Sequence, residues 1–176
     1  MSIPHEPAPA KAVLSILSAR WDSFWPGLLS RLEAILGPAD FHSDLLPFTQ
    51  TTYYDAELGT PIFRRLLSFA TPLPMDRLAA VKLATNAVEN EYAENGRRRF
   101  NLDPGYLTRE RLVLATGKNF VHRIYLGQGI FADLTLIYRK GRFEALPWTF
   151  PDYRTEAIQT ILTRIRSTIP TQGNRP

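Results

Sequence analysis

The strongest indication of fold in this chain is the alternation of apolar and polar side chains in residues 121–148, VHRIYLGQGIFADLTLIYRKGRFEALPW. Successive side chains of a β-strand point to opposite faces of the sheet, so this alternation is typical of half-buried strands. Gly127-Gln128-Gly129 fits a three-residue hairpin loop, and Lys140-Gly141 fits a two-residue turn. The segment therefore predicts three strands that follow one another as an antiparallel β-meander.

The first of these turns also predicts which residues of the meander face each other. A three-residue loop puts Arg123 opposite Asp133, Tyr125 opposite Phe131 and Val121 opposite Thr135. Oppositely charged residues that face each other on neighbouring strands stabilise a sheet. We therefore expect a cross-strand ion pair between Arg123 and Asp133.

Alternation further divides the meander into an apolar face, with His122 at its edge, and a polar face. The polar face carries Arg123, Tyr125, Asp133, Thr135, Arg139, Arg142 and Glu144. On this basis the neighbours His122 and Arg123 point to opposite sides of the sheet. We predict that His122 is a partly buried, hydrogen-bonded histidine rather than a catalytic base.

The chain before the meander predicts the element order β-α-β-β-α-β. Strand patterns occupy 11–19, 39–48, 62–73 and 97–107, and helical spacing of apolar residues occupies 28–36 and the segment from Pro74 to Asn95-Gly96. Asp103-Pro104-Gly105 has the composition of a turn that ends the last of these strands. Residues 49–61 read as a loop, and 108–117 fit either a helix or a strand.

We therefore predict an α+β fold, with a ferredoxin-like split β-α-β core that is extended by the C-terminal antiparallel β-meander. A final helix, from Thr155 to Arg166, follows the meander. Proline-rich residues 1–10 predict a disordered leader, residues 11–169 a single domain, and residues 170–176 a flexible tail.

Composition excludes several classes of protein. The 176 residues are 44% apolar, which is enough for a hydrophobic core, and contain no cysteine, which rules out disulfides and thiolate ligands. No apolar run approaches the ~20 residues of a transmembrane helix, and the N-terminus lacks the pattern of a signal peptide. We expect a bacterial-type cytoplasmic protein with no membrane partner.

The net charge of +4 is unevenly distributed along the chain. Residues 1–95 contain 7 basic and 11 acidic side chains, whereas residues 96–176 contain 14 basic and 6 acidic ones. A basic block of this kind attracts anionic partners such as phosphates, nucleotides or RNA. The alternative is that these charges pair with the acidic first half inside one fold, and the sequence alone does not decide between the two.

Two polar segments offer further candidate ligand-binding residues. Tyr53 and Tyr54 lie with Glu57 in the predicted loop, where binding residues concentrate, although a tyrosine pair can equally cap the core. Asn101 and Asp103 can contact a ligand, but hydrogen bonding within an Asx turn is the favoured interpretation.

Motifs that would identify an activity are missing. Gly117-Lys118 is followed by Asn119, where a phosphate loop needs Ser or Thr, and no Gly-x-Ser-x-Gly sequence is present. Asp40, His42 and Asp44 lie on one face of a predicted strand, yet no fourth ligand is visible. We therefore predict no metal site, and no cofactor follows from the sequence.

Three stretches together resemble a bacterial family known as domain of unknown function 4416. They are TTYYDAELG, GRRRFNLDPGYL and HRIYLGQGIFADLTLIYRKGRFEALPWTFPDYR, and the resemblance extends over nearly the whole chain from Lys11 onward. It implies no established activity. Proteins of this family are sometimes labelled GTP-binding, but this sequence lacks both the phosphate loop and an Asn-Lys-x-Asp guanine-recognition stretch, which argues against GTPase chemistry.

Two classes of function remain for the chain. The first is a binding module for an anionic small ligand, a nucleotide or a phosphorylated metabolite, with ligand-binding residues Tyr53, Tyr54, Arg99, Asn101, Arg123, Tyr125, Asp133 and Arg139. This hypothesis requires Tyr53, Arg99 and Arg123 to converge in space. The second is an enzyme acting on such a ligand, with His122 or Glu57 as general base. RNA binding through residues 97–123 is a third alternative, and the oligomeric state is open.

Overall fold

The computed structural model describes residues 3–25 and 27–171. Its described part combines a nine-stranded antiparallel sheet with four α-helices, which confirms the predicted α+β class. The strands are β1 (Ala10–Ser18), β2 (Ala39–His42), β3 (Leu46–Pro47), β4 (Phe63–Leu73), β5 (Asn101–Leu107), β6 (Arg111–Thr116), β7 (Arg123–Gly127), β8 (Ile130–Arg139) and β9 (Arg142–Ala145). The helices are α1 (Gly27–Leu36), α2 (Asp55–Leu58), α3 (Leu78–Glu91) and α4 (Glu156–Ser167).

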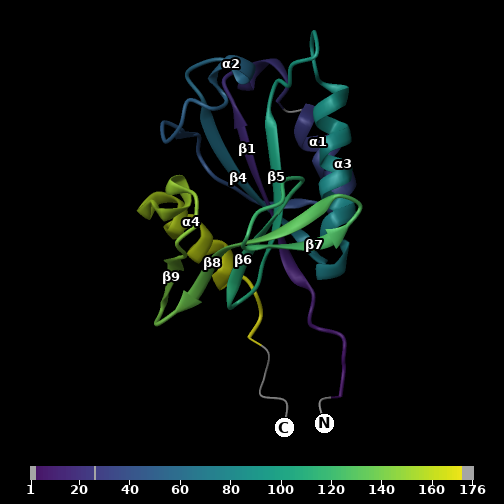
Figure 1. Ribbon diagram of the computed structural model, residues 1–176, viewed down its shortest axis with the longest axis vertical. Coiled ribbons are helices and arrows are strands. Elements are labelled where there is room, and N and C mark those ends of the chain that lie inside the picture. Colours follow the sequence, from purple (N-terminus) through teal and green to yellow (C-terminus); the bar gives the residue numbers. More distant parts are fainter. Residues whose placement is uncertain (1–2, 26, 172–176) are drawn as a thin grey trace.

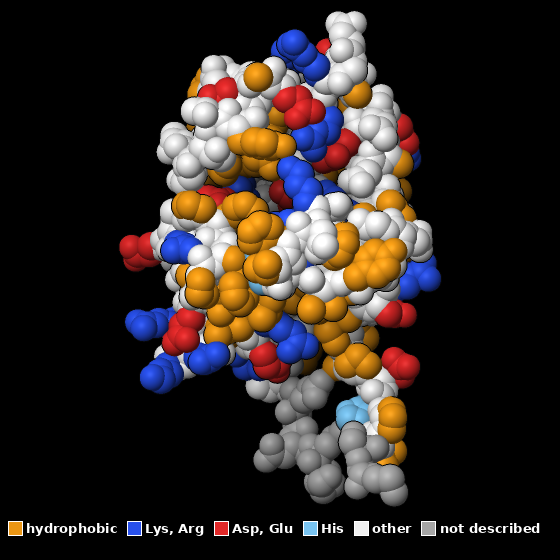
Figure 2. Space-filling view, in the orientation of Figure 1, with side chains coloured by type: hydrophobic (Ala, Val, Ile, Leu, Met, Phe, Trp, Pro, Cys, Tyr) orange, Lys and Arg blue, Asp and Glu red, His pale blue; other side chains and the backbone are white. Residues whose placement is uncertain are grey.

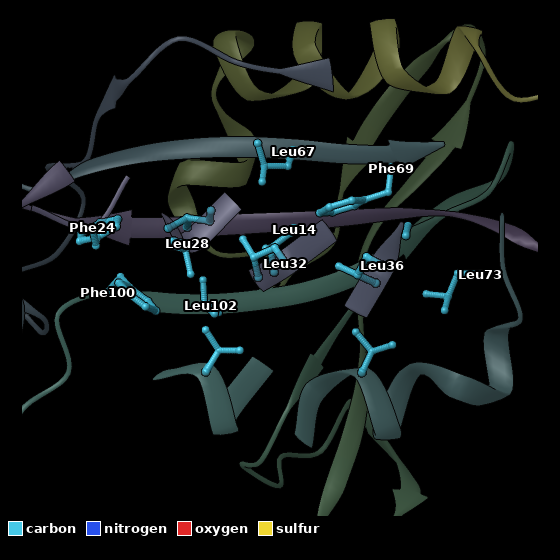
Figure 3. Close-up of a cluster of buried hydrophobic side chains, with 14 of the residues drawn as sticks. Leu14, Phe24, Leu28, Leu32, Leu36, Leu67, Phe69, Leu73, Phe100 and Leu102 are labelled. Atoms are coloured by element: carbon cyan, nitrogen blue, oxygen red, sulfur yellow. The ribbon is translucent and has the colours of Figure 1, made fainter. Parts of the chain in front are cut away.

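The first half of the chain forms the part of the sheet with strand order β2-β4-β1-β5, and every neighbouring pair is antiparallel. Helices α1 and α3 lie beside each other on one face of these strands (Figure 1). Leu28, Leu32 and Leu36 recur every four residues, so they form one stripe of α1 and are buried against β1 and β4. Figure 3 shows these leucines between Leu67 and Phe69 of β4 and Leu102 of β5.

The second half continues the sheet in the order β6-β8-β7, with β9 paired to β8. Helix α4 covers the face opposite to α1 and α3, where Ile158, Leu162 and Ile165 pack against Leu112 and Leu136. The sheet thus carries a hydrophobic layer on each face. Successive side chains of a strand contribute to one layer and then to the other, and the helices complete both layers.

The meander has the predicted pairing in two of three positions. Arg123 faces Asp133 and Tyr125 faces Phe131, and the two turns have the positive φ angles that glycine-containing hairpins require. The predicted pair of Val121 with Thr135 is wrong, because β7 begins at Arg123 and Val121 lies in the preceding turn.

The predicted turn at Asp103-Pro104-Gly105 is also wrong, because β5 runs straight through these residues. Ser15, Leu14 and Val13 of β1 pair with them one after another. A Cβ on Gly105 would lie 2.4 Å from the carbonyl oxygen of Val113, so glycine serves here to let β5 and β6 approach closely. Pairing with β1 along all three residues, and with β6 at Gly105, overrides the local preference of this tripeptide for a turn.

Smaller differences concern segment boundaries. The strand predicted over 39–48 is interrupted and forms β2 and β3, and the loop predicted over 49–61 contains the short helix α2. The ambiguous segment 108–117 forms the strand β6. Residues 3–9 form neither helix nor strand, whereas residues 1–2 of the predicted leader and 172–176 of the predicted tail lie outside the described residues. No helix among the described residues is long and apolar enough to span a membrane.

Candidate ligand-binding site

The candidate site is a cavity of about 930 Å³ at the point where β5 and β6 diverge. These strands pair only between Gly105–Leu107 and Leu112–Leu114, so Asn101 to Pro104 pair with β1 alone. The cavity is lined by β5, the end of β6, α3, the loop around Tyr53 and the segment 150–153. Figure 1 shows β5 rising beside β1 while β6, β7 and β8 lie lower, and Figure 2 shows basic and acidic side chains meeting in a hollow between the two parts.

One wall of the cavity is a polar stripe of α3. Lys82, Asn86 and Asn90 follow at intervals of four residues and line the cavity together with Glu89. Lys82 donates a hydrogen bond to the carbonyl of Leu102 at 2.6 Å, and Glu89 accepts one from the Leu102 amide at 2.5 Å. The side-chain amides of Asn86 and Asn90 form no hydrogen bond with another described residue. This wall therefore offers two uncommitted amide groups to a ligand.

The floor is a hydrogen-bonded row of charged and amide groups that begins at Glu57. Arg98 donates from two nitrogens to the two carboxylate oxygens of Glu57, each at 2.7 Å, and from Nη1 to Asn101 at 2.7 Å. Asn101 in turn donates to Asp103 at 2.7 Å, and Lys82 lies 3.6 Å from the same carboxylate. Asp103 thus occupies the end of a row whose other members hold one another in place.

A second ion pair, deeper in the molecule, closes one side of the cavity. Arg64 contacts Asp152 and donates hydrogen bonds to Ser15 at 2.5 Å and to the Tyr153 hydroxyl at 3.1 Å. The guanidinium group also lies 5.2 Å from the centre of the Phe48 ring. Burial raises the pKa of Tyr153 to about 12, so its phenol stays protonated at neutral pH.

The mouth of the cavity carries a lysine and an arginine. Lys118 Nζ donates to the Tyr53 hydroxyl at 3.0 Å, and its own carbonyl accepts a hydrogen bond from Arg123 Nη1 at 2.9 Å. Arg123 Nε donates to Asp133 at 2.9 Å. The predicted cross-strand ion pair therefore exists, and it holds the Arg123 side chain at the mouth.

The pKa shifts at the site follow from burial and from these contacts. Burial raises the pKa of the Glu89 carboxyl and of the Tyr54 phenol, because the charged form of each loses contact with water. The hydrogen bond from Lys118 lowers the pKa of Tyr53, and the paired Arg98 lowers that of Glu57. Glu57 is thus held as a carboxylate, whereas the environment of Glu89 favours its protonated form.

Charges in the cavity are nearly balanced. Arg64 pairs with Asp152, Lys82 with Asp103, Arg98 with Glu57, and Arg123 with Asp133. Among the described residues that line the cavity, Lys118 is the one cation with no carboxylate within salt-bridge distance. The cationic character of the site is therefore concentrated at its mouth.

The structure brings together five of the residues predicted from sequence to bind a ligand, namely Tyr53, Tyr54, Asn101, Arg123 and Asp133. The remaining three lie outside the cavity lining: Arg99 pairs with Glu94, Tyr125 is exposed beside Phe131, and Arg139 is exposed at the end of β8. Tyr53 and Arg123 thus share one cavity, and Arg99 does not belong to it. Glu57 reaches the lining only through Arg98.

His122 occupies a different position from the one expected. The prediction that it points away from Arg123 is wrong, since His122 Nε2 and Arg123 Nε both contact Asp133 Oδ2, at 3.1 and 2.9 Å. The reason is that His122 lies in the turn before β7, where strand alternation does not apply. Its ring stacks on Trp148 at 4.8 Å and does not line the cavity.

Sequence reasoning missed several residues of the cavity, among them Arg64, Lys82, Glu89, Arg98, Lys118 and Asp152. For α3 a signal was present, because Lys82 and Glu89 fall next to the apolar stripe of Leu78, Val81 and Val88 and are therefore expected near the protein interior. For Arg64 the signal was a charged residue inside an apolar strand. Arg98 and Lys118 lie in the basic block of the second half, but no local pattern assigns them or Asp152 to one site, because tertiary structure alone brings them together.

Asp40, His42 and Asp44 lie apart from this cavity. Asp40 contacts Lys11 and accepts a hydrogen bond from Ser68 at 2.6 Å, and His42 packs edge-on against Trp25. Among the described residues no group of three or more histidine or acidic side chains is arranged to hold a metal ion.

One family model, described as "Domain of unknown function (DUF4416)", matches residues 8–168. Comparison with curated proteins and with solved structures found no match.

Proposed function

We propose that this chain, which belongs to the DUF4416 family as its sequence motifs predicted, is a binding module for an anionic small molecule, a nucleotide or a phosphorylated metabolite. The proposal rests above all on Lys118, the unpaired cation at the mouth of the cavity between β5 and β6. The cavity volume of about 930 Å³ lies within the range of small-molecule sites.

Lys118 and Arg123 supply donors suited to a phosphate group. The Lys118 ammonium contacts only the hydroxyl and ring of Tyr53 among the described residues, so it keeps hydrogens for an anion. Arg123 uses Nε and Nη1 within the protein, whereas its Nη2 forms no hydrogen bond with a described residue. Charge-assisted hydrogen bonds from two such groups are the usual means of holding a phosphate.

Two aromatic side chains at the rim suit a planar group of the ligand. Tyr53 is 65% exposed and Phe150 is 48% exposed, although each also lines the cavity. Exposed aromatic rings beside a polar cavity provide apolar area for a nucleobase or a sugar face at little conformational cost. This arrangement favours an organic phosphate over inorganic phosphate alone.

The side chains considered for catalysis support binding rather than turnover. Glu57 is held by two hydrogen bonds from the Arg98 guanidinium group, and His122 packs between Asp133 and Trp148 outside the cavity lining. A general base needs a free basic atom within reach of the substrate. Neither group lines the cavity, so neither is within reach of a ligand there.

A binding screen tests the proposal. Nucleoside 5′-phosphates and sugar phosphates at millimolar concentration, added to the full chain, are expected to raise its melting temperature in a thermal-shift assay. Lys118→Gln is expected to weaken binding of the best ligand about tenfold in calorimetry, because one charge-assisted hydrogen bond is lost.

Arg139→Gln is the matched control, since it removes one positive charge from an exposed residue outside the cavity. Its affinity is expected to stay close to that of the wild type. If both substitutions weakened ligand binding equally, the ligand would be attracted by the overall positive charge of the protein. This result would contradict a binding site at Lys118. Absence of any stabilising phosphate, together with binding of RNA that falls steeply with salt, would replace the proposal with RNA binding.

Two finer expectations belong to the same proposal. A ferredoxin-like split β-α-β arrangement of the first half is supported by the antiparallel strand order β2-β4-β1-β5 and by α1 and α3 on one face, and an experimental structure would test it. A cytoplasmic location is supported by the absence of cysteine from the sequence, and fractionation of cells tests it.

A further inference from the structure

We infer that the ligand of this cavity carries two neighbouring hydroxyl groups, as a ribose does, and that Asp103 and Asn86 bind them. The inference rests on the proposed function and specifies the ligand end that lies away from Lys118. It follows from the chemical difference between the mouth of the cavity and its floor.

Asp103 is the carboxylate of the floor that remains open to a ligand. Its side chain is 31% exposed and lines the cavity, whereas that of Glu89 is 6% exposed. Asn101 donates to Asp103 Oδ2 at 2.7 Å, and Lys82 lies 3.6 Å from Oδ1. A carboxylate accepts about four hydrogen bonds, so these two contacts leave acceptor positions for donors from the ligand.

Asn86 adds a group that both donates and accepts. It is half-buried on α3, lines the cavity, and its side-chain amide is not hydrogen-bonded to any other described residue. Asn90, one turn further along α3, has the same property at a more exposed position. A hydroxyl group also donates and accepts, so a pair of hydroxyls satisfies a carboxylate and an amide together.

The charges around Asp103 favour ligand hydroxyl groups over a ligand phosphate or a ligand ammonium group. A phosphate would be repelled by the Asp103 carboxylate and is therefore expected at Lys118 and Arg123. A ligand ammonium would meet cations that already surround this carboxylate, because Lys82 is paired with it and Arg98 is joined to it through Asn101. Neutral hydrogen-bond donors avoid both conflicts.

Matched ribose and deoxyribose ligands test this inference on the full chain. The probes are ribose 5-phosphate and the four common ribonucleoside 5′-monophosphates, each compared by calorimetry with its 2-deoxy counterpart. Since a site that hydrogen-bonds a hydroxyl discriminates against the ligand without it, we expect at least tenfold weaker binding of the deoxy form.

The variants Asn86→Ala and Asp103→Asn are expected to reduce this discrimination to less than threefold, because the deoxy ligand keeps only one of the two hydroxyls and so loses less affinity than the ribose form. Asn119→Ala, an exposed asparagine outside the cavity lining, is the control and should keep the wild-type ratio. Circular dichroism verifies the fold of each variant, and the wild-type ratio tests recognition of the hydroxyl even where a variant does not fold.

The outcomes separate the inference from the proposed function. Equal binding of ribose and deoxyribose forms would overturn the inference and leave phosphate binding at Lys118 intact. Discrimination that persists in both folded variants would also overturn it, because other residues would then bind the hydroxyls. If none of the phosphates binds, the proposed function fails and the inference fails with it.

Discussion

At the scale of single residues, the ion pair between Arg64 and Asp152 is deeply buried, with side chains that are 5% and 10% exposed. Both Nη nitrogens of Arg64 donate inside the protein, Nη1 to Ser15 and Tyr153 and Nη2 to Asp152. Removing one partner of a buried pair leaves the other charge without compensation, which costs more than the pair itself contributes.

Arg64→Leu is therefore expected to lower the free energy of unfolding by about 3–5 kcal/mol, measured by urea denaturation. Arg31→Ala provides the comparison, because Arg31 and Glu91 form a pair whose side chains are 49% and 46% exposed. Exposed ion pairs of this kind contribute little to stability, so the control should denature at nearly the same urea concentration as the wild type. A similar decrease in the free energy of unfolding in both variants would show that burial does not determine how much these ion pairs contribute to stability.

Glu89 gives the stability of the protein a specific pH dependence. Burial raises its pKa above the ordinary value of 4.5, so the folded state binds this proton more tightly than the unfolded state does. The resulting stabilisation is complete below pH 4.5 and is lost as the pH rises through the folded-state pKa. Glu89→Gln removes this contribution.

We expect the stability of Glu89→Gln relative to the wild type to increase between pH 4 and pH 7.5. Urea denaturation at intervals over this range measures it, with the exposed Glu91→Gln as a control. A difference between wild type and Glu89→Gln that is constant with pH would contradict the raised pKa.

At the scale of elements, the divergence of β5 and β6 creates the candidate site. The two strands pair over Gly105–Leu107 and Leu112–Leu114, and they separate beyond Gly105, on the side that contains Asn101 and Asp103. A side chain at position 105 would have no room, because its Cβ would lie 2.4 Å from a backbone oxygen of β6. Gly105 thus determines where the strands meet.

Gly105→Ala is expected to destabilise the protein by about 1–3 kcal/mol, the usual cost of overpacking a core, and to weaken ligand binding. The control for stability is Gly117→Ala, since a Cβ at Gly117 meets nothing within 4 Å; because Gly117 also lines the cavity, this variant is not used as a control for binding. Chemical denaturation and calorimetry measure the two effects. A Gly105→Ala variant as stable as the control would show that the strands can separate at no cost.

At the scale of the whole molecule, some basic residues of the second half pair with acidic residues of the first half. Arg98 contacts both Glu57 and Glu89, and Arg99 contacts Glu94. Part of the basic block is therefore neutralised inside the fold, as the second interpretation of the charge distribution proposed. The net charge of +4 does not translate into a cationic cavity, and the proposed binding of an anion depends on Lys118.

What the sequence determines by itself is the periodic part of the structure. The meander, the pairing of Arg123 with Asp133, and helices α1, α3 and α4 follow from patterns within about 30 neighbouring residues, because strand and helix repeats are local properties. Five of the predicted ligand-binding residues, Tyr53, Tyr54, Asn101, Arg123 and Asp133, also line the cavity.

Only the tertiary structure decided the rest, because it depends on contacts between distant segments. Asp103-Pro104-Gly105 is a strand because β1 pairs with it, and His122 turns toward Asp133 because it precedes β7. Arg64 meets Asp152 across 88 positions, and Arg98 meets Glu57 across 41. No local sequence pattern predicts these contacts between distant residues. They form only when the strands pair into the sheet and β5 diverges from β6.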